Sequence, residues 1–232
     1  MENWRNKAYQ ALRRSEGLLK TDVVYLAKGG LWLSLSQVVA TLSGFLISIA
    51  FANLISKESF GIYKFVISVA GIVGVLSLTG MGTAITRSVA NGFESLRQGF
   101  RTNLKWSIGI FIAGTVLSIY YYFKGNTTLS ISFLLMGAFY PITLSASLYS
   151  PYLLGKKDFR RNSFYAIIYS IVPAAIMIAT LLLTKNIWII VSIYFSSSTL
   201  TVLFLYSRTL KVYLGAKYGH DPELFSYSGH LS

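Results

Sequence analysis

Residues 163–184 read SFYAIIYSIVPAAIMIATLLLT and contain no Asp, Glu, Lys or Arg. An α-helix needs about 20 predominantly apolar residues to cross the hydrocarbon core of a bilayer. Inside that core a helix pairs its own backbone polar groups, whereas an open strand leaves them unpaired. This stretch therefore predicts a transmembrane helix.

The same pattern recurs along the chain. Five further stretches carry no charged side chain, at residues 29–56, 65–86, 106–123, 125–155 and 186–207. Each approaches or exceeds the length that a spanning helix needs. We expect an all-α fold, a polytopic membrane protein with six transmembrane helices at about 30–52, 61–83, 106–123, 129–150, 163–184 and 187–207. These helices form one unit at 29–208, with a segment at 1–28 before it and a tail at 209–232 after it.

The composition excludes a solvated domain. Hydrophobic residues make up 53% of the chain and charged residues only 12%, about half the usual charged fraction. The net charge of +13 would suit nucleic-acid binding if the cations were clustered on a water-exposed surface. They lie instead between the apolar stretches. The expected partner is therefore membrane lipid, and nucleic acid is not expected.

The positions of the cations predict the orientation. With the N-terminus inside, 17 of the 21 Lys and Arg residues lie on the cytoplasmic side, and the other four are Lys57, Lys64, Lys124 and Lys185. Cytoplasmic loops of membrane proteins carry such an excess of Lys and Arg. We expect a multi-pass protein of the cytoplasmic membrane with both termini and the loops at 84–105 and 151–162 in the cytoplasm.

The first 20 residues place Trp4, Ala8, Leu12 and Leu19 roughly on one helical face, with the arginines elsewhere. This pattern predicts a basic amphipathic helix along the cytoplasmic lipid surface. A frayed basic tail is the alternative for the first few residues.

The side chains that most catalysis requires are missing from the expected spans. All eight acidic residues lie in loops or tails, both histidines, His220 and His230, lie in the tail, and there is no Cys. Enzymes that act on phosphates or sugars generally need acids, histidines or metal ligands around the reacting group. We therefore expect no enzyme activity, no catalytic residue, no metal site and no cofactor.

Uncharged polar residues occur throughout the spans, and four residues are candidates for substrate binding. Gln37 lies inside the first span, and an amide in hydrocarbon has more groups to satisfy than Ser or Thr. Lys64 lies about one turn into the second span, Arg87 follows its inner end, and Lys28 precedes the first span. These cations either reach up to the lipid headgroups or contact an anionic substrate.

Glycines and prolines suggest where helices pack or bend. Gly61, Gly71, Gly74, Gly80 and Gly82 in the second span predict close helix packing. Pro141 and Pro173 lie inside the fourth and fifth spans, and each is either a hinge or a static kink.

The stretch from Gly29 to Ala90 resembles the lipid-linked oligosaccharide flippases, the polysaccharide-export branch of the multidrug/oligosaccharidyl-lipid/polysaccharide exporter superfamily. The resemblance rests on Ala27-Lys28-Gly29, Ala52-Asn53-Leu54-Ile55, Phe60-Gly61-Ile62-Tyr63 and Gly80-Met81-Gly82-Thr83-Ala84-Ile85-Thr86-Arg87, and extends more loosely over residues 20–210.

The resemblance implies a transporter that moves a polyprenyl-diphosphate-linked oligosaccharide across the cytoplasmic membrane for cell-surface polysaccharide synthesis. It also implies a two-lobe exporter, of which this chain supplies the N-terminal six-helix lobe, so that a second lobe or a second copy is an expected partner. Two alternatives stay open. One is a non-transporting scaffold subunit of a glycan-synthesis complex. The other is a drug/sodium-type exporter lobe, which an acid in the first span would favour.

Overall fold

The computed structural model describes residues 23–213, with side chains described from Gly29 onward. Every regular element in this range is helical, as expected for an all-α protein. The helices are α2 (Val23–Leu54), α3 (Lys57–Val73), a 3-10 turn (Gly74–Leu76), α4 (Met81–Ala90), α5 (Leu96–Trp106), α6 (Ile108–Phe123), α7 (Thr127–Ala146), α8 (Tyr149–Gly155), α9 (Phe159–Leu183) and α10 (Ile187–Tyr213). The amphipathic helix expected at the N-terminus and the tail that follows Tyr213 lie outside the described residues.

Six helical segments of the described range are long and apolar enough to cross a membrane. They are Gly29–Leu54, Lys57–Leu76, Leu96–Phe123, Thr127–Gly155, Phe159–Leu183 and Ile187–Tyr213. This result confirms the expected fold class.

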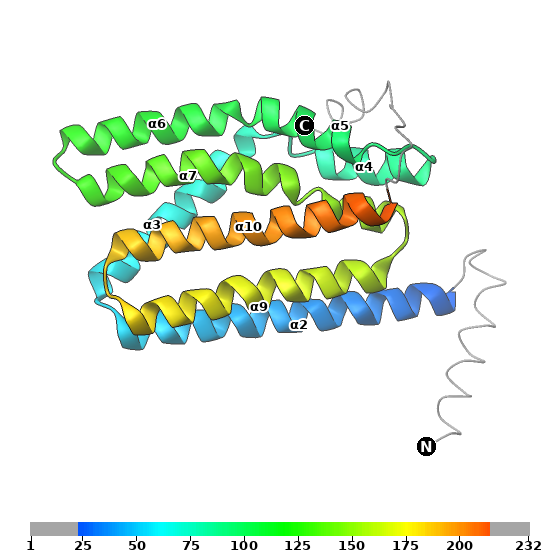
Figure 1. Ribbon diagram of the computed structural model, residues 1–232, viewed down its shortest axis with the longest axis horizontal. Coiled ribbons are helices and arrows are strands. Elements are labelled where there is room, and N and C mark those ends of the chain that lie inside the picture. Colours follow the sequence, from blue (N-terminus) through cyan, green and yellow to red (C-terminus); the bar gives the residue numbers. More distant parts are fainter. Residues whose placement is uncertain (1–22, 214–232) are drawn as a thin grey trace, which may run out of the picture.

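The long helices lie side by side in the order α2, α9, α10, α7 and α6, while α3 crosses behind them (Figure 1). α2 and α9 run parallel to each other, as do α10 and α7, whereas α9 is antiparallel to α10 and α7 is antiparallel to α6 (Figure 1). α2 packs along α9, α6 packs along α7, and α10 lies between α9 and α7. The shorter helices α4, α5 and α8 gather at the end of the bundle where α2 and α9 begin and α10 ends (Figure 1). The connections therefore alternate between the two ends of the bundle.

Polar residues at the turns explain where several helices begin. The side chains of Ser56, Asn126 and Asp158 accept a hydrogen bond from the backbone N–H three residues later, at the start of α3, α7 and α9. Such caps satisfy donors that the first turn of a helix leaves unpaired. The connection between α6 and α7 is short because Gly125 adopts a left-handed backbone conformation, with φ at 74°.

The second expected span is not one helix. α3 ends at Val73 and gives way to the 3-10 turn, and α4 begins only at Met81. At the break, Ser77 donates from both its backbone N–H and its hydroxyl to the Gly74 carbonyl, at 3.0 and 2.7 Å. These two bonds replace the regular helical hydrogen bonds at the break. The chain at 65–86 can therefore bend while the Gly74 carbonyl group stays paired.

The backbones of α6 and α7 approach each other closely. A Cβ atom added to Gly114 would stand 2.8 Å from the Gly137 Cα and 2.9 Å from the Phe133 carbonyl oxygen. By contrast, a Cβ atom at Gly61 or Gly71 would meet nothing within 4 Å. The prediction that these two glycines mediate close packing was therefore wrong. Both glycines occupy exposed positions on α3. The absence of a side chain there leaves open space beside the helix and brings no other helix closer.

Candidate functional site

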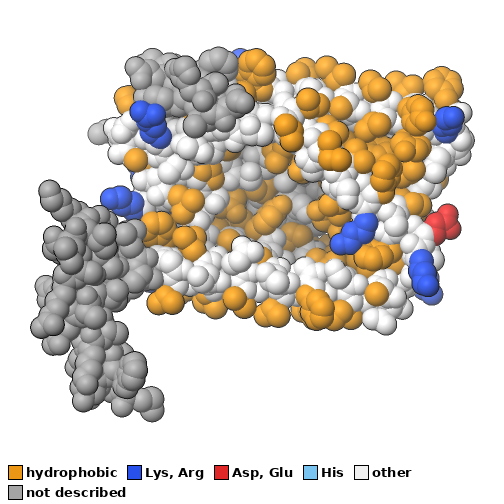
Figure 2. Space-filling model, turned by 180° about the vertical axis from the view of Figure 1, so that it is seen from behind, with side chains coloured by type: hydrophobic (Ala, Val, Ile, Leu, Met, Phe, Trp, Pro, Cys, Tyr) orange, Lys and Arg blue, Asp and Glu red, His pale blue; other side chains and the backbone are white. Residues whose placement is uncertain are grey.

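One face of the bundle is hollowed in its middle (Figure 2). A cavity of about 160 Å³ lies between α3, α7, α9 and α10. Its lining consists of small, aromatic and uncharged polar side chains, namely Ile67, Ala70, Gly71, Tyr140, Thr143, Tyr169, Tyr194, Phe195 and Ser198. The missing side chain of Gly71 is thus part of what keeps this space open.

Three tyrosines give the cavity its polarity. The hydroxyls of Tyr140, Tyr169 and Tyr194 have no hydrogen-bond partner among the described residues, although their rings line an apolar bundle. These hydroxyls are not among the fully enclosed side-chain atoms that lack a partner in the described range. Thr143 differs, because its hydroxyl lies 2.7 Å from that of Thr199 and ties α7 to α10. The three tyrosyl hydroxyls are therefore free to bind water or a polar ligand.

α2 presents a polar flank along most of its length. Ser34, Gln37, Thr41 and Ser48 fall on one side of the helix, while Ser36 and Ser43 are buried on another. The hydroxyls of Thr41 and Ser48 bond carbonyls of their own helix, at 3.0 Å each. The exposed amide of Gln37 has no such partner within the described residues. Gln37 is thus the group on this flank with the most unused hydrogen-bonding capacity.

The same helix also has an exposed apolar side. Leu31, Val38, Leu42 and Phe45 are exposed hydrophobic residues on α2. In the view from behind, α2 forms the lower edge of the molecule, with uncharged surface toward the hollow and hydrophobic side chains along the outer border (Figure 2). α2 therefore separates an apolar exterior from a more polar concave face.

The structure places the predicted binding residues at three different locations. Lys64 is exposed on α3, with its ammonium 5.4 Å from the Phe60 ring centroid. It precedes Ile67 by three residues and Gly71 by seven, which is the spacing of one helix face. Lys64 therefore shares a face with two residues that line the cavity, about 10 Å along the axis from Gly71.

The other predicted residues do not join Lys64. Arg87 is exposed on α4, beyond the helix break and toward the opposite end of the bundle from Lys64. Gln37 lies on the polar flank of α2. Lys28 belongs to α2, but its side chain lies outside the described residues. Within residues 23–213, no three His, Asp or Glu side chains gather in a way that would hold a metal ion.

Two acidic clusters at the end of the bundle were missed by sequence reasoning. Glu94, in the α4–α5 connection, accepts a hydrogen bond from the Tyr152 hydroxyl and lies 2.5 Å from the Lys156 Nζ atom. The partners are about 60 residues away in sequence, at the end of α8. Nothing in the local sequence around Glu94 marks this contact.

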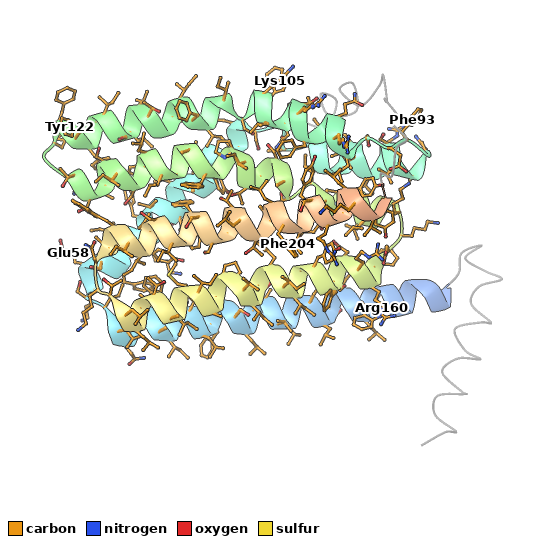
Figure 3. The ribbon with its side chains drawn as sticks, viewed as in Figure 1. Glu58, Phe93, Lys105, Tyr122, Arg160 and Phe204 are labelled. Carbon is orange, nitrogen blue, oxygen red and sulfur yellow. The ribbon has the colours of Figure 1, made fainter. Side chains whose placement is uncertain are left out.

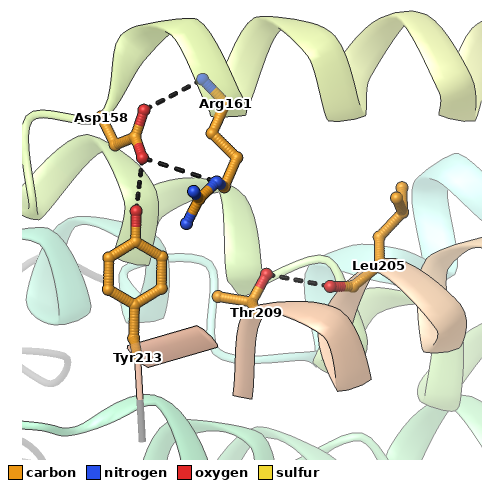
Figure 4. A network of polar contacts seen from close by, with 5 residues as sticks. All are labelled: Asp158, Arg161, Leu205, Thr209 and Tyr213. Carbon is orange, nitrogen blue, oxygen red and sulfur yellow. Dashed lines mark hydrogen bonds and ion pairs between the residues drawn. The ribbon is translucent and has the colours of Figure 1, made fainter. Parts of the chain in front are cut away.

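The second cluster connects the start of α9 to the end of α10 (Figure 4). Asp158 caps α9 through the Arg161 backbone N–H at 3.0 Å, and its other oxygen lies 3.6 Å from the Arg161 Nε atom. The Tyr213 hydroxyl donates to the same carboxylate. The capping contact is local to the start of α9, whereas the contact with Tyr213 joins residues 55 positions apart.

Comparison with known families adds a further observation to this geometry. Residues 26–228 match the family described as polysaccharide biosynthesis protein. The chain belongs to this family. Searches of curated proteins and of solved structures gave no match.

Membership of the polysaccharide biosynthesis family confirms the resemblance that the Gly29–Ala90 motifs indicated. The match covers all six apolar helical segments. The chain is therefore a polysaccharide biosynthesis protein with the helices of a multi-pass membrane protein.

Proposed function

We propose that this chain is one lobe of a flippase that translocates a polyprenyl-diphosphate-linked oligosaccharide across the cytoplasmic membrane. The observation that carries the proposal is the cavity lined by Tyr140, Tyr169 and Tyr194, whose hydroxyls lack partners among the described residues. It lies inside an apolar bundle that belongs to a polysaccharide biosynthesis family. Because no described side chain occupies these hydroxyls, a polar ligand that enters the cavity can bond to all three.

The chemistry of the cavity suits a sugar. Tyrosyl hydroxyls both donate and accept hydrogen bonds, as sugar hydroxyls do. The cavity lining carries no charge. The sugar is therefore held only by uncharged hydrogen bonds and ring contacts, which are weak enough to release it on the outer side of the membrane. Lys64, on the same face of α3, supplies a positive charge for the diphosphate that joins the sugar to its lipid.

Translocation also needs a second body. Alternating access works by rocking two units about a site held between them. The concave face that carries the cavity and the polar flank of α2 is the surface on which a second lobe, from another chain or another copy, would complete the pathway. We propose that neither unit performs covalent chemistry, and that both termini of the present lobe lie in the cytoplasm.

A scaffold subunit of a glycan-synthesis complex is the main alternative. A scaffold would be expected to have a fully packed interior of small residues, and the open cavity favours transport instead. A drug/sodium-type exporter lobe is the other alternative, and the absence of an acid from α2 within Gly29–Leu54 argues against it.

Deletion of the gene in its host distinguishes transport from scaffolding. Loss of a flippase should abolish surface glycan while the lipid-linked oligosaccharide accumulates on the inner leaflet. Loss of a scaffold should instead lower the amount of lipid-linked oligosaccharide. Both quantities are measured by extraction of the lipid fraction and by surface glycan staining.

Complementation then tests the cavity. The triple substitution Tyr140→Phe, Tyr169→Phe and Tyr194→Phe keeps the rings and removes the hydroxyls. It should restore little surface glycan at normal protein level. Tyr122→Phe, the same change at an exposed position of α6, is the matched control and should complement fully. Full complementation by the triple variant would remove the basis of the proposal.

A further inference from the structure

A second concave site lies at the end of the bundle, away from the tyrosine cavity. It is a pocket of about 510 Å³ between α2, α9 and α10. Three arginines and several aromatic residues line it together with one acid, and the full lining is Trp32, Asp158, Arg160, Arg161, Phe164, Tyr165, Arg208 and Val212. The pocket is therefore positively charged and partly aromatic.

The charges in this pocket are unevenly compensated. Asp158 already receives the Tyr213 hydroxyl, the Arg161 backbone N–H and the Arg161 side chain (Figure 4). Arg160 lies with its Cζ atom 5.8 Å from the Trp32 ring centroid and forms no ion pair with a described residue. The guanidinium of Arg208 is exposed and has no partner in the described part of the chain. Two guanidinium groups thus remain for an anionic ligand.

The depth of the pocket matches that of lipid phosphates. Trp32 lies four residues after Lys28, near the start of the charge-free stretch 29–56, and Arg208 directly follows the charge-free stretch 186–207. Trp and long basic side chains at this level mark the boundary between headgroups and hydrocarbon.

An apolar groove continues from the pocket between α9 and α10. It has a volume of about 540 Å³ and is lined by Ile168, Val172, Ile176, Ile193, Ser196, Ser197, Leu200, Thr201 and Phe204. Phe164 and Ile168 are one helical turn apart, as are Arg208 and Phe204, so the lining of the pocket passes directly into that of the groove. Figure 3 shows Phe204 extending from α10 toward α9, and Arg160 near the start of α9.

The polar atoms of the groove are already satisfied. The Ser196 hydroxyl donates to the Ser192 carbonyl and the Thr201 hydroxyl to the Ser197 carbonyl, at 2.7 Å each. The groove therefore presents an apolar surface to any occupant. Along α10, from Ile193 to Phe204, it follows 11 residues of helix, or about 17 Å, which is close to the thickness of one leaflet, about 15 Å.

We infer that the pocket and the groove together bind one anionic phospholipid of the surrounding bilayer. The phosphate lies among the guanidinium groups of Arg160, Arg161 and Arg208, and one acyl chain occupies the α9–α10 groove. Arginine forks match phosphate oxygens in geometry as well as charge. The site is separate from the tyrosine cavity, because Leu200 and Phe204 lie about 120° around α10 from Tyr194 and Ser198.

The length of the groove favours a phospholipid over the polyprenyl substrate. A groove that matches one leaflet accommodates an acyl chain, whereas a long polyprenyl chain would extend well beyond it. Anionic phospholipids also supply the negative surface that attracts basic segments next to a membrane.

Lipid binding by the purified full chain tests the headgroup contact and needs no transport assay. Native mass spectrometry would compare dioleoyl phosphatidylglycerol with dioleoyl phosphatidylcholine. The double variant Arg160→Gln, Arg208→Gln should bind phosphatidylglycerol on the order of tenfold more weakly or worse, with phosphatidylcholine unchanged. Arg101→Gln, Lys105→Gln removes the same charge outside the pocket and should bind like the unaltered chain. Equal binding by all three proteins would overturn the inference.

A second pair of variants tests the groove. Ser196→Leu places a larger apolar side chain in the groove and should weaken dioleoyl but not dihexanoyl phosphatidylglycerol. Ser192→Leu, one turn away on α10 and outside the groove lining, should affect neither. Loss of both lipids in Ser196→Leu would contradict a chain-binding groove. If the double arginine variant does not remain monodisperse, Arg208→Gln alone is tested, because the Arg208 side chain forms no ion pair with a described residue.

Competition identifies the occupant. The protein is first loaded with labelled dioleoyl phosphatidylglycerol. Unlabelled phosphatidylglycerol should displace this labelled lipid at a lower concentration than undecaprenyl diphosphate does. The reverse order would assign the site to the substrate and overturn the choice of a phospholipid.

Discussion

Glu94 is the only acid of the α4–α5 connection and holds two partners from α8 at once. Its side chain is 22% exposed and that of Lys156 is 26% exposed, so the ion pair is only partly screened by water. Glu94→Gln removes this attraction, and we expect a loss of about 1–2 kcal/mol in stability. Thermal unfolding in detergent measures it. Glu58→Gln, at an exposed position of α3, is the control. Equal melting temperatures for both variants would show that the cluster contributes nothing.

Lys64 and Lys124 form a natural pair for testing the proposed diphosphate contact. Both are exposed cations over an aromatic ring, 5.4 Å from the Phe60 centroid and 5.9 Å from the Tyr120 centroid. Only Lys64 shares a helix face with the cavity lining. In complemented cells, Lys64→Ala should therefore lower surface glycan several-fold at constant protein level, whereas Lys124→Ala should not. A similar effect of both substitutions would indicate interaction with headgroups alone.

The α6–α7 pair depends on one glycine contact. A methyl group at Gly114 would collide with the α7 backbone at Gly137 and Phe133, and neither atom belongs to a flexible side chain. Gly114→Ala should therefore destabilise the bundle by about 1–3 kcal/mol, seen as a lower melting temperature in detergent. Gly44→Ala is the same change in α2, where a Cβ atom meets nothing within 4 Å. The packing described for α6 and α7 is wrong if Gly114→Ala melts as Gly44→Ala does.

The two ends of the whole bundle are expected on opposite sides of the membrane. Because the chain contains no Cys, a single introduced cysteine reports one position without background. Asn91 and Thr127 are exposed residues at opposite ends, in the α4–α5 connection and at the start of α7. In intact cells an impermeant thiol reagent should label Thr127→Cys and not Asn91→Cys. The opposite pattern would invert the topology that the positive-inside rule predicts.

The sequence alone determined the fold class, the six apolar segments and the family resemblance. These properties depend on a local quantity, since a run of about 20 apolar residues is a membrane helix wherever the rest of the chain lies. It also marked the unusual position of Gln37. It did not reveal that the second span breaks after Val73, because the apolar composition continues through the break.

Only the tertiary structure decided which residues meet. Tyr140, Tyr169 and Tyr194 come from three helices, and their common cavity depends on how α7, α9 and α10 pack around Gly71. The same holds for Glu94 with Tyr152, and for Arg160 with Arg208, which lie 58 and 48 positions apart in the chain. Helix hydrophobicity commits each segment to the membrane but leaves its rotation and neighbours open. Those are selected by contacts between small residues and hydrogen bonds across helices, which are long-range properties of the folded bundle.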